Sequence, residues 1–393
     1  MLAPGNETQP ANSIMKTLCS FLLLALSLVV TLAAEPSVQP TKGLSALKLA
    51  RDEAEKTYEK GVESLPDTPE GEKASQKFWQ TFDQKQSDLF MSAVDLARRD
   101  PKSQEALEAL EWVLTLPRSY FLTSGIPALE LVTRHHAANP KVGKIVAWVG
   151  YYLPHERAEA RPAALALIEA VAETNPDRTA RGQAIIARAW EARKRHDQTA
   201  GAAEASAAEK AFELVLKEYA DCPRLMRPKQ RTLGEEAQQE LFALRNLLVG
   251  KTAPEITGDD LEGVKFKLSD YRGKVVALVF WASWCGPCMQ MVPQERELVE
   301  HMKGKPFVLI GVNGDSDRKD AQKAVKKEGI RWRSFWNGSD GPHGPISRGW
   351  NVRGWPTVYV MDGAGVIRAR EVFDKDLDRA VEKLVQEITA NGN

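Results

Sequence analysis

Two cysteines separated by two residues offer the strongest covalent chemistry in this 393-residue sequence. Cys285 and Cys288 belong to the pentapeptide Trp284-Cys-Gly-Pro-Cys288. A thiolate attacks disulfides and also binds zinc, and a second thiol one helical turn later can close a disulfide with the first. The spacing therefore indicates either a dithiol that exchanges disulfides or one half of a metal site.

A metal site at Cys285 and Cys288 would lack two of its ligands. A structural zinc site uses four side chains, so two more would have to come from elsewhere in the chain. Cys222 has no second cysteine close to it, and the sequence contains no His-x-x-x-His pattern. We therefore expect a redox-active dithiol at Cys285 and Cys288, with no metal and no cofactor.

The flanking segments explain how the dithiol would be activated. An apolar run at 275–280 predicts a strand, and residues 288–302 predict a helix, so the cysteines lie at a strand–helix junction. The first turn of a helix presents unpaired N–H groups and the positive end of the helix dipole, which stabilise a thiolate and lower its pKa. We expect Cys285 to be the exposed nucleophile and Cys288 to resolve the mixed disulfide, and Pro287 suits a first helical turn.

The elements around this junction alternate between strands and helices, which predicts an α/β domain over residues 249–393. The last two strands are joined by Asp362-Gly-Ala-Gly365, a sequence typical of a hairpin turn. Besides the pair already named, the pattern predicts strands at 307–312, 357–361 and 366–368 and helices at 318–329 and 377–389.

Four motifs of this domain resemble a known family: Gly250-Lys-Thr-Ala-Pro254, Leu268-Ser-Asp-Tyr-Arg-Gly273, Phe280-Trp-Ala-Ser-Trp-Cys-Gly-Pro-Cys288 and Gly354-Trp-Pro-Thr357. Together they resemble the TlpA/ResA-type thioredoxin-like thiol–disulfide oxidoreductases over about residues 250–390. The resemblance implies a thioredoxin-like fold and exchange of disulfides with proteins. It also implies that the helical residues before 249 are an addition to that fold.

The resemblance assigns further residues to the site. It implies that Pro356 follows a cis peptide bond and faces the disulfide, and that Trp355 and Pro356 contact the substrate chain. Trp284, Gly286 and Pro287 flank the cysteines and complete the expected substrate-binding set. Reducing thioredoxins also carry Gly-Pro between their cysteines, so the resemblance favours reduction of protein disulfides, with electrons from a membrane or thioredoxin-like donor.

Two positions depart from the family pattern. Thioredoxins have a buried Asp six residues before the first cysteine, where this chain has Val279, and relatives commonly have a Glu three residues after the second, where it has Met291. A carboxylate at either place would take the proton from the second thiol. Asp315 or Asp317 is a candidate replacement, although residues at such positions usually cap the next helix.

Residues 35–248 are rich in Ala, Leu, Glu, Lys and Arg, which predicts an all-α domain. The pattern predicts helices at 44–65, 72–99, 104–116, 126–138, 163–174, 181–195, 203–219 and 234–248. Leu131-Val132 before Asn139-Pro140 is echoed by Leu167-Ile168 before Asn175-Pro176 at a spacing of 36 residues. The sequence leaves open whether this region is an irregular bundle or a set of degenerate helical repeats. It shows no pattern for chemistry, so its expected role is to bind a protein partner.

Residues 1–34 predict a signal peptide. Lys16 precedes an apolar run at 17–34 that ends in Ala33-Ala34 before Glu35, and Met15 is an alternative start. We expect an exported protein, periplasmic or otherwise extracytoplasmic, with an uncleaved N-terminal anchor as the alternative.

Charge and composition narrow the function classes. The 53 basic and 53 acidic residues cancel, which gives no electrostatic reason to expect a nucleic-acid partner. Two alternatives to the oxidoreductase stay open: a thioredoxin-fold peroxidase, which would carry Thr where this chain has Ala282, and a helical adaptor with a redox-regulated domain.

Overall fold

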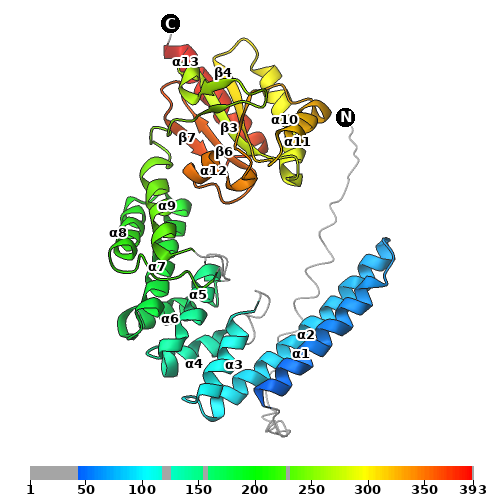
Figure 1. Ribbon diagram of the computed structural model, residues 1–393, viewed down its shortest axis with the longest axis vertical. Coiled ribbons are helices and arrows are strands. Elements are labelled where there is room, and N and C mark those ends of the chain that lie inside the picture. Colours follow the sequence, from blue (N-terminus) through cyan, green and yellow to red (C-terminus); the bar gives the residue numbers. More distant parts are fainter. Residues whose placement is uncertain (1–42, 117–124, 154–157, 227–230, 392–393) are drawn as a thin grey trace, which may run out of the picture. The chain divides into compact units, whose positions relative to one another are not determined.

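The described chain consists of an N-terminal helical part (residues 44–246) and a C-terminal α/β part (residues 250–391), drawn in blue to green and in green to red in Figure 1. The computed structural model describes residues 43–116, 125–153, 158–226 and 231–391. The predicted signal peptide lies outside these residues. Both parts belong to one structural unit that begins at Leu44.

The helical part confirms the predicted all-α class. Several of its helices begin at side-chain caps, for example Thr68, Ser103 and Asp177, each of which accepts a hydrogen bond from a backbone N–H in the first turn. The α-helices described here are α1 (Leu44–Glu63), α2 (Pro69–Arg99), α3 (Gln104–Leu114), α4 (Ile126–His136), α5 (Gly143–Tyr152), α6 (Arg161–Thr174), α7 (Arg178–Thr199), α8 (Ala202–Glu218) and α9 (Leu233–Asn246).

The echoed Asn-Pro turns of the sequence lie against each other. The side-chain amide of Asn175 donates to the carbonyl oxygens of Ala137 and Asn139, at 2.6 and 2.9 Å. Contact between equivalent turns is what stacked helical repeats require. The sequence pattern missed α5, because its apolar residues are buried on several sides and show no helical period.

The α/β part is a five-stranded sheet with helices on its faces, as the alternating pattern predicted. Its strand order is β5-β4-β3-β6-β7, with β3 parallel to β4 and antiparallel to β6. The main elements are β3 (Val275–Trp281), α10 (Gly286–His301), β4 (Phe307–Asn313), α11 (Arg318–Glu328), β5 (Ser334–Trp336), α12 (Pro345–Gly349), β6 (Thr357–Met361), β7 (Ile367–Arg370) and α13 (Asp374–Asn391).

The central strand β3 divides the core into two layers. Every residue of β3 is buried, and alternate side chains point to opposite faces. Val279 and Trp281 pack with α10 and α13, whereas Leu278 and Phe280 pack on the other face with Trp350. The cysteines therefore follow the most enclosed strand of the sheet.

The predicted strands and helices of this part are confirmed with shifts of a few residues at their ends. The hairpin at Asp362–Gly365 is also confirmed, since β6 and β7 pair antiparallel. Three strands were missed, namely β1 (Thr257–Asp259), β2 (Lys265–Lys267) and β5, because three residues are too few to show an alternating pattern. Within the described ranges, no helix is both long enough and apolar enough to span a bilayer.

Candidate active site

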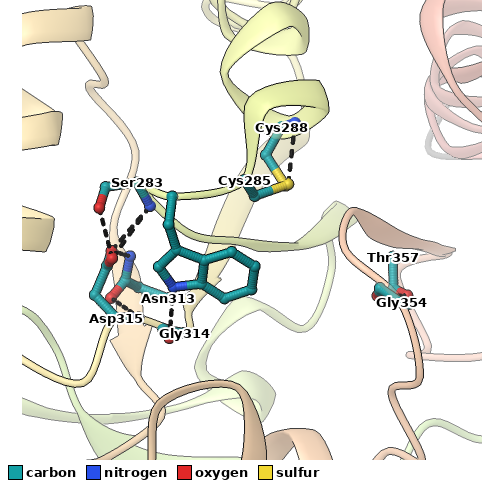
Figure 2. The surroundings of a disulfide bond; sticks show 9 residues. Ser283, Cys285, Cys288, Asn313, Gly314, Asp315, Gly354 and Thr357 are labelled. Carbon is teal, nitrogen blue, oxygen red and sulfur yellow. Dashed lines mark hydrogen bonds between the residues drawn. A yellow bond between two sulfur atoms is a disulfide. The ribbon is translucent and has the colours of Figure 1, made fainter. Parts of the chain in front are cut away.

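Cys285 and Cys288 form a disulfide at the N-terminus of α10, at the strand–helix junction that the sequence predicted (Figure 2). Cys285 is the N-cap residue of α10, and the backbone N–H of Cys288 donates to its sulfur at 3.2 Å. Gly286 and Pro287 form the first turn, where the missing N–H of proline costs no helical hydrogen bond. The sulfur of Cys285 therefore sits where a thiolate is best stabilised.

The expectation that Cys285 is exposed is wrong for this disulfide form. Cys285 is 4% exposed and Cys288 is 2% exposed, and both belong to the buried cluster that includes Val279 and Val292. Packing of the junction against the sheet covers both sulfurs while they are bonded to each other. The exposed residues of the motif are Trp284, at 54%, Gly286 and Pro287.

The segment before Cys285 is held by Asp315, which follows β4. The backbone N–H and the hydroxyl of Ser283 donate to this carboxylate at 3.0 and 2.6 Å, and the Asn313 amide donates at 2.7 Å (Figure 2). The Trp284 indole donates to the carbonyl oxygen of Gly314. Asp315 is buried and fixes the approach to the cysteines, a role that the sequence analysis did not assign.

Asp317 has the alternative role that the sequence analysis gave it, because its side chain caps α11 by accepting from the N–H of Lys319. The Asp315 carboxylate is occupied by the donors just described. These hydrogen bonds direct the carboxylates of Asp315 and Asp317 to groups other than Cys288.

Trp355 and Pro356 lie beside the disulfide because of the register between β3 and β6. Phe280 pairs with Thr357, so the residue before β6 is adjacent to the end of β3 that leads into Cys285. The Trp355–Pro356 bond is cis, as the resemblance implied. The rings of Trp355 and Trp284 are 5.8 Å apart at their centroids. Trp284 and Trp355, two of the predicted substrate-binding residues, therefore lie together.

Two further contacts fix this loop. The Thr357 hydroxyl donates to the carbonyl oxygen of Gly354 at 2.9 Å (Figure 2). A Cβ at Gly314 would lie 2.4 Å from the ring of Trp355, so a larger residue there would displace the ring. The ring of Trp355 therefore packs directly on the backbone that follows β4.

A buried carboxyl that the sequence analysis missed lies on the same helix. Glu295 is 5% exposed and shares the buried face of α10 with Cys288, Val292 and Leu298. Burial raises the pKa of Glu295 to about 8. A glutamate seven residues after Cys288 stands on the same helical face, and that spacing is the signal that could have identified it.

Comparison with known proteins agrees with the geometry. Residues 249–370 match the model of the AhpC/TSA family. The thiol-disulfide oxidoreductase ResA of Geobacillus kaustophilus is 30% identical over 139 residues, which are 35% of this chain and 78% of ResA. This chain belongs to the ResA family of thiol-disulfide oxidoreductases.

Other relatives of this ResA-family chain align over a similar length. The thioredoxin-like protein YneN of Bacillus subtilis is 34% identical over 119 residues, which are 30% of this chain and 68% of YneN. A crystal structure of the thioredoxin domain of a thiol-disulfide oxidoreductase from Bacteroides vulgatus is 31% identical, covers 36% of this chain and 99% of that domain, and has a TM-score of 0.34.

Glu295 predicts a pH-dependent stability. The unfolded carboxyl ionises near its ordinary pKa of 4.5, whereas the folded one stays protonated up to about 8. Across that window the unfolded state holds fewer protons, so the free energy of unfolding falls as pH rises and levels off above about 8. Glu295→Gln is neutral throughout this pH range. At pH 8 its free energy of unfolding is expected to exceed that of wild type by about 4 kcal/mol.

Urea unfolding at the two ends of this window measures the difference. The exposed Glu297, on the same helix, supplies the control Glu297→Gln, which is expected to shift stability by less than about 0.5 kcal/mol at either pH. A wild type whose stability does not decline with pH would contradict the assignment.

The missing family carboxylate predicts a slow second step. Val279 is buried and Met291 is partly buried against the same cluster as Cys288, and apolar surroundings disfavour a buried thiolate. Met291→Glu is expected to speed the resolution of a mixed disulfide near neutral pH by roughly 10²-fold, since a placed general base is typically worth at least that factor. The measurement is the rate of product release from about pH 6 to about pH 10.

Gln290→Glu is the matched control for Met291→Glu, because it adds the same charge to the exposed side of α10. It is expected to leave the rate of resolution unchanged. A wild-type rate that is already fast and independent of pH near neutrality would show that no base is missing.

Proposed function

We propose that this protein is exported and reduces disulfides in other proteins, with Cys285 attacking and Cys288 resolving. The observation that carries the proposal is the Cys285–Cys288 disulfide at the N-terminus of α10, beside the Trp355–Pro356 loop. This arrangement combines a stabilised thiolate with a second sulfur in bonding range, and disulfide exchange needs both.

The reaction begins with the dithiol form. The Cys285 thiolate attacks one sulfur of the substrate disulfide, that bond breaks, and the departing substrate sulfur takes up a proton. Cys288 then loses its proton and attacks the sulfur of Cys285. This second exchange releases the reduced substrate and forms the Cys285–Cys288 disulfide that the structure contains.

The direction of transfer is supported by Gly286 and Pro287, the pair that reducing thioredoxins carry between their cysteines. Reduction of a substrate consumes the two electrons of the dithiol, so each turnover requires a donor to restore it. A membrane or thioredoxin-like dithiol is the class of donor that balances this exchange.

The substrate is proposed to bind over Trp284, Gly286, Pro287, Trp355 and Pro356. Trp284 is exposed, and Trp355 and Pro356 are partly exposed, so an apolar surface is open to solvent beside the disulfide. An extended peptide with its disulfide over Cys285 would contact both tryptophans. Such a surface suits proteins better than small polar disulfides.

The proposed course of the chain has three segments: a signal peptide over 1–34, a helical domain over 35–248 and a thioredoxin-like domain over 249–393. The mature protein is predicted to begin close to Glu35, since the apolar run ends at Ala33-Ala34. N-terminal sequencing of protein from fractionated cells checks this. An intact Met1 or Met15 on protein recovered from the cytosol would contradict export.

Trapping experiments test the two cysteine roles. Cys288→Ser is predicted to accumulate a mixed disulfide through Cys285, because the covalent intermediate then has no intramolecular exit. Cys285→Ser is predicted to accumulate none. The measurement is the amount of substrate covalently bound to each variant, separated without reductant and identified by mass spectrometry.

The buried free thiol Cys222 provides the control, since Cys222→Ser removes a cysteine outside the pair. That variant is expected to turn over like wild type and to trap nothing. Equal trapping by Cys285→Ser and Cys288→Ser would overturn the assignment of roles.

A further inference from the structure

A buried carboxylate of the helical part binds the loop that precedes Pro356. Glu240 of α9 is 2% exposed, and one of its oxygens accepts hydrogen bonds from the side chains of Asn351 and Arg353. Its other oxygen lies 3.9 Å from the guanidinium of Arg193 on α7. The hydrogen bonds that Asn351 and Arg353 donate to this buried carboxylate thus come from the segment leading to the cis peptide bond.

Arg353 is also held from a second side. Its guanidinium carbon lies 4.0 Å from the centroid of the Trp190 ring on α7, a cation–π contact. The Trp190 indole in turn donates to Glu236 of α9 at 2.7 Å, which fixes the orientation of the ring. The Arg353 side chain is therefore held between the Glu240 carboxylate and the Trp190 ring, both of which belong to the helical part.

The contact continues into the apolar core. Ala243 of α9 and Leu247, the C-cap residue of this helix, belong to one buried cluster with Phe280, Trp350 and other residues of the α/β part. The C-terminal end of α9 therefore packs into the core of the α/β part.

The backbone at Asn351 depends on this contact as well. Asn351 has a φ of 48°, in the left-handed region that asparagine tolerates better than most residues. Its side chain donates to Glu240, so the same carboxylate holds the turn at 351 and the arginine at 353. Two residues later the Trp355 ring packs on Gly314 and lies near Trp284.

We propose that Glu240 is a positioning residue for disulfide exchange, through which the helical part sets the conformation of the Trp355–Pro356 loop that receives the substrate protein. The inference rests on the proposed function, because it concerns the loop of that same site. Glu240 acts through Asn351 and Arg353 and does not itself contact the reacting sulfurs. The helical part is then a working component of the oxidoreductase.

The test compares two disulfide substrates in the full chain. Glu240→Gln is expected to lower kcat/KM for a protein disulfide, that of insulin, by on the order of tenfold, because displacement of a substrate-positioning group is costly. The rate with cystamine, which has no peptide backbone to bind, is expected to change by less than about twofold. Arg353→Gln, at a half-exposed position, is expected to show the same split without removing the buried carboxylate.

Glu191→Gln is the matched control. Glu191 is a buried carboxylate whose partners Arg161 and Arg195 both lie in the helical part. Its substitution is expected to leave both rates unchanged. Amide hydrogen exchange over residues 350–358 provides a readout without catalysis, and exchange there is expected to be faster in Glu240→Gln and Arg353→Gln but not in Glu191→Gln.

The two proposals fail in different ways. A wild type that reduces neither insulin nor cystamine contradicts the proposed function. In that case amide hydrogen exchange over residues 350–358 still tests whether Glu240 holds the loop. If wild type reduces both substrates and Glu240→Gln or Arg353→Gln slows the two equally, or leaves exchange at 350–358 unaltered, the positioning role is wrong.

Discussion

The pairing of Phe280 with Thr357 is the constraint on which the active site depends. It places the end of β3, which leads into Cys285, beside the start of β6, which follows Pro356. The disulfide at the helix N-terminus and the cis-proline loop come from segments about 70 residues apart, and this register makes them neighbours. A shift of one residue would turn the buried side chains of β3 to the wrong face, so the core of the domain enforces the geometry of the site.

Other contacts serve to hold the two segments that this register brings together. Asp315 binds the residue two positions before Cys285, and Gly314 leaves room for the ring of Trp355. On the opposite face, α9 contributes Ala243 and Leu247 to the core and Glu240 to the loop before Pro356. The loop after β4 and helix α9 of the helical part therefore both contact the segments that form the site.

Much of this could be predicted from the sequence, because the information was local. The Trp284–Cys288 motif, the buried strand before it and the helix after it are contiguous in the chain, and their residue types alone indicate a stabilised thiolate. The helices of the N-terminal part were predicted from composition, apart from α5, whose all-round burial hides the helical period. Resemblance supplied Pro356, which no local pattern would have singled out.

What the sequence could not provide are contacts between distant segments. Glu240 and Arg353 are 113 residues apart, and each alone looks like an ordinary surface charge. Glu295 likewise appears polar until packing encloses it, and the burial of Cys285 depends on the folded junction. Pairing across the fold decides these cases, and a single sequence does not reveal it.

We infer that the N-terminus of α10 makes Cys285 the reactive sulfur. Alkylation of the reduced protein by iodoacetamide over a range of pH, with the modified cysteine identified by peptide mass spectrometry, tests it most directly. We expect Cys285 to react first, with a midpoint pH below that of an unperturbed cysteine. Reaction of Cys288 at an equal rate, or a midpoint at the unperturbed value, would contradict it.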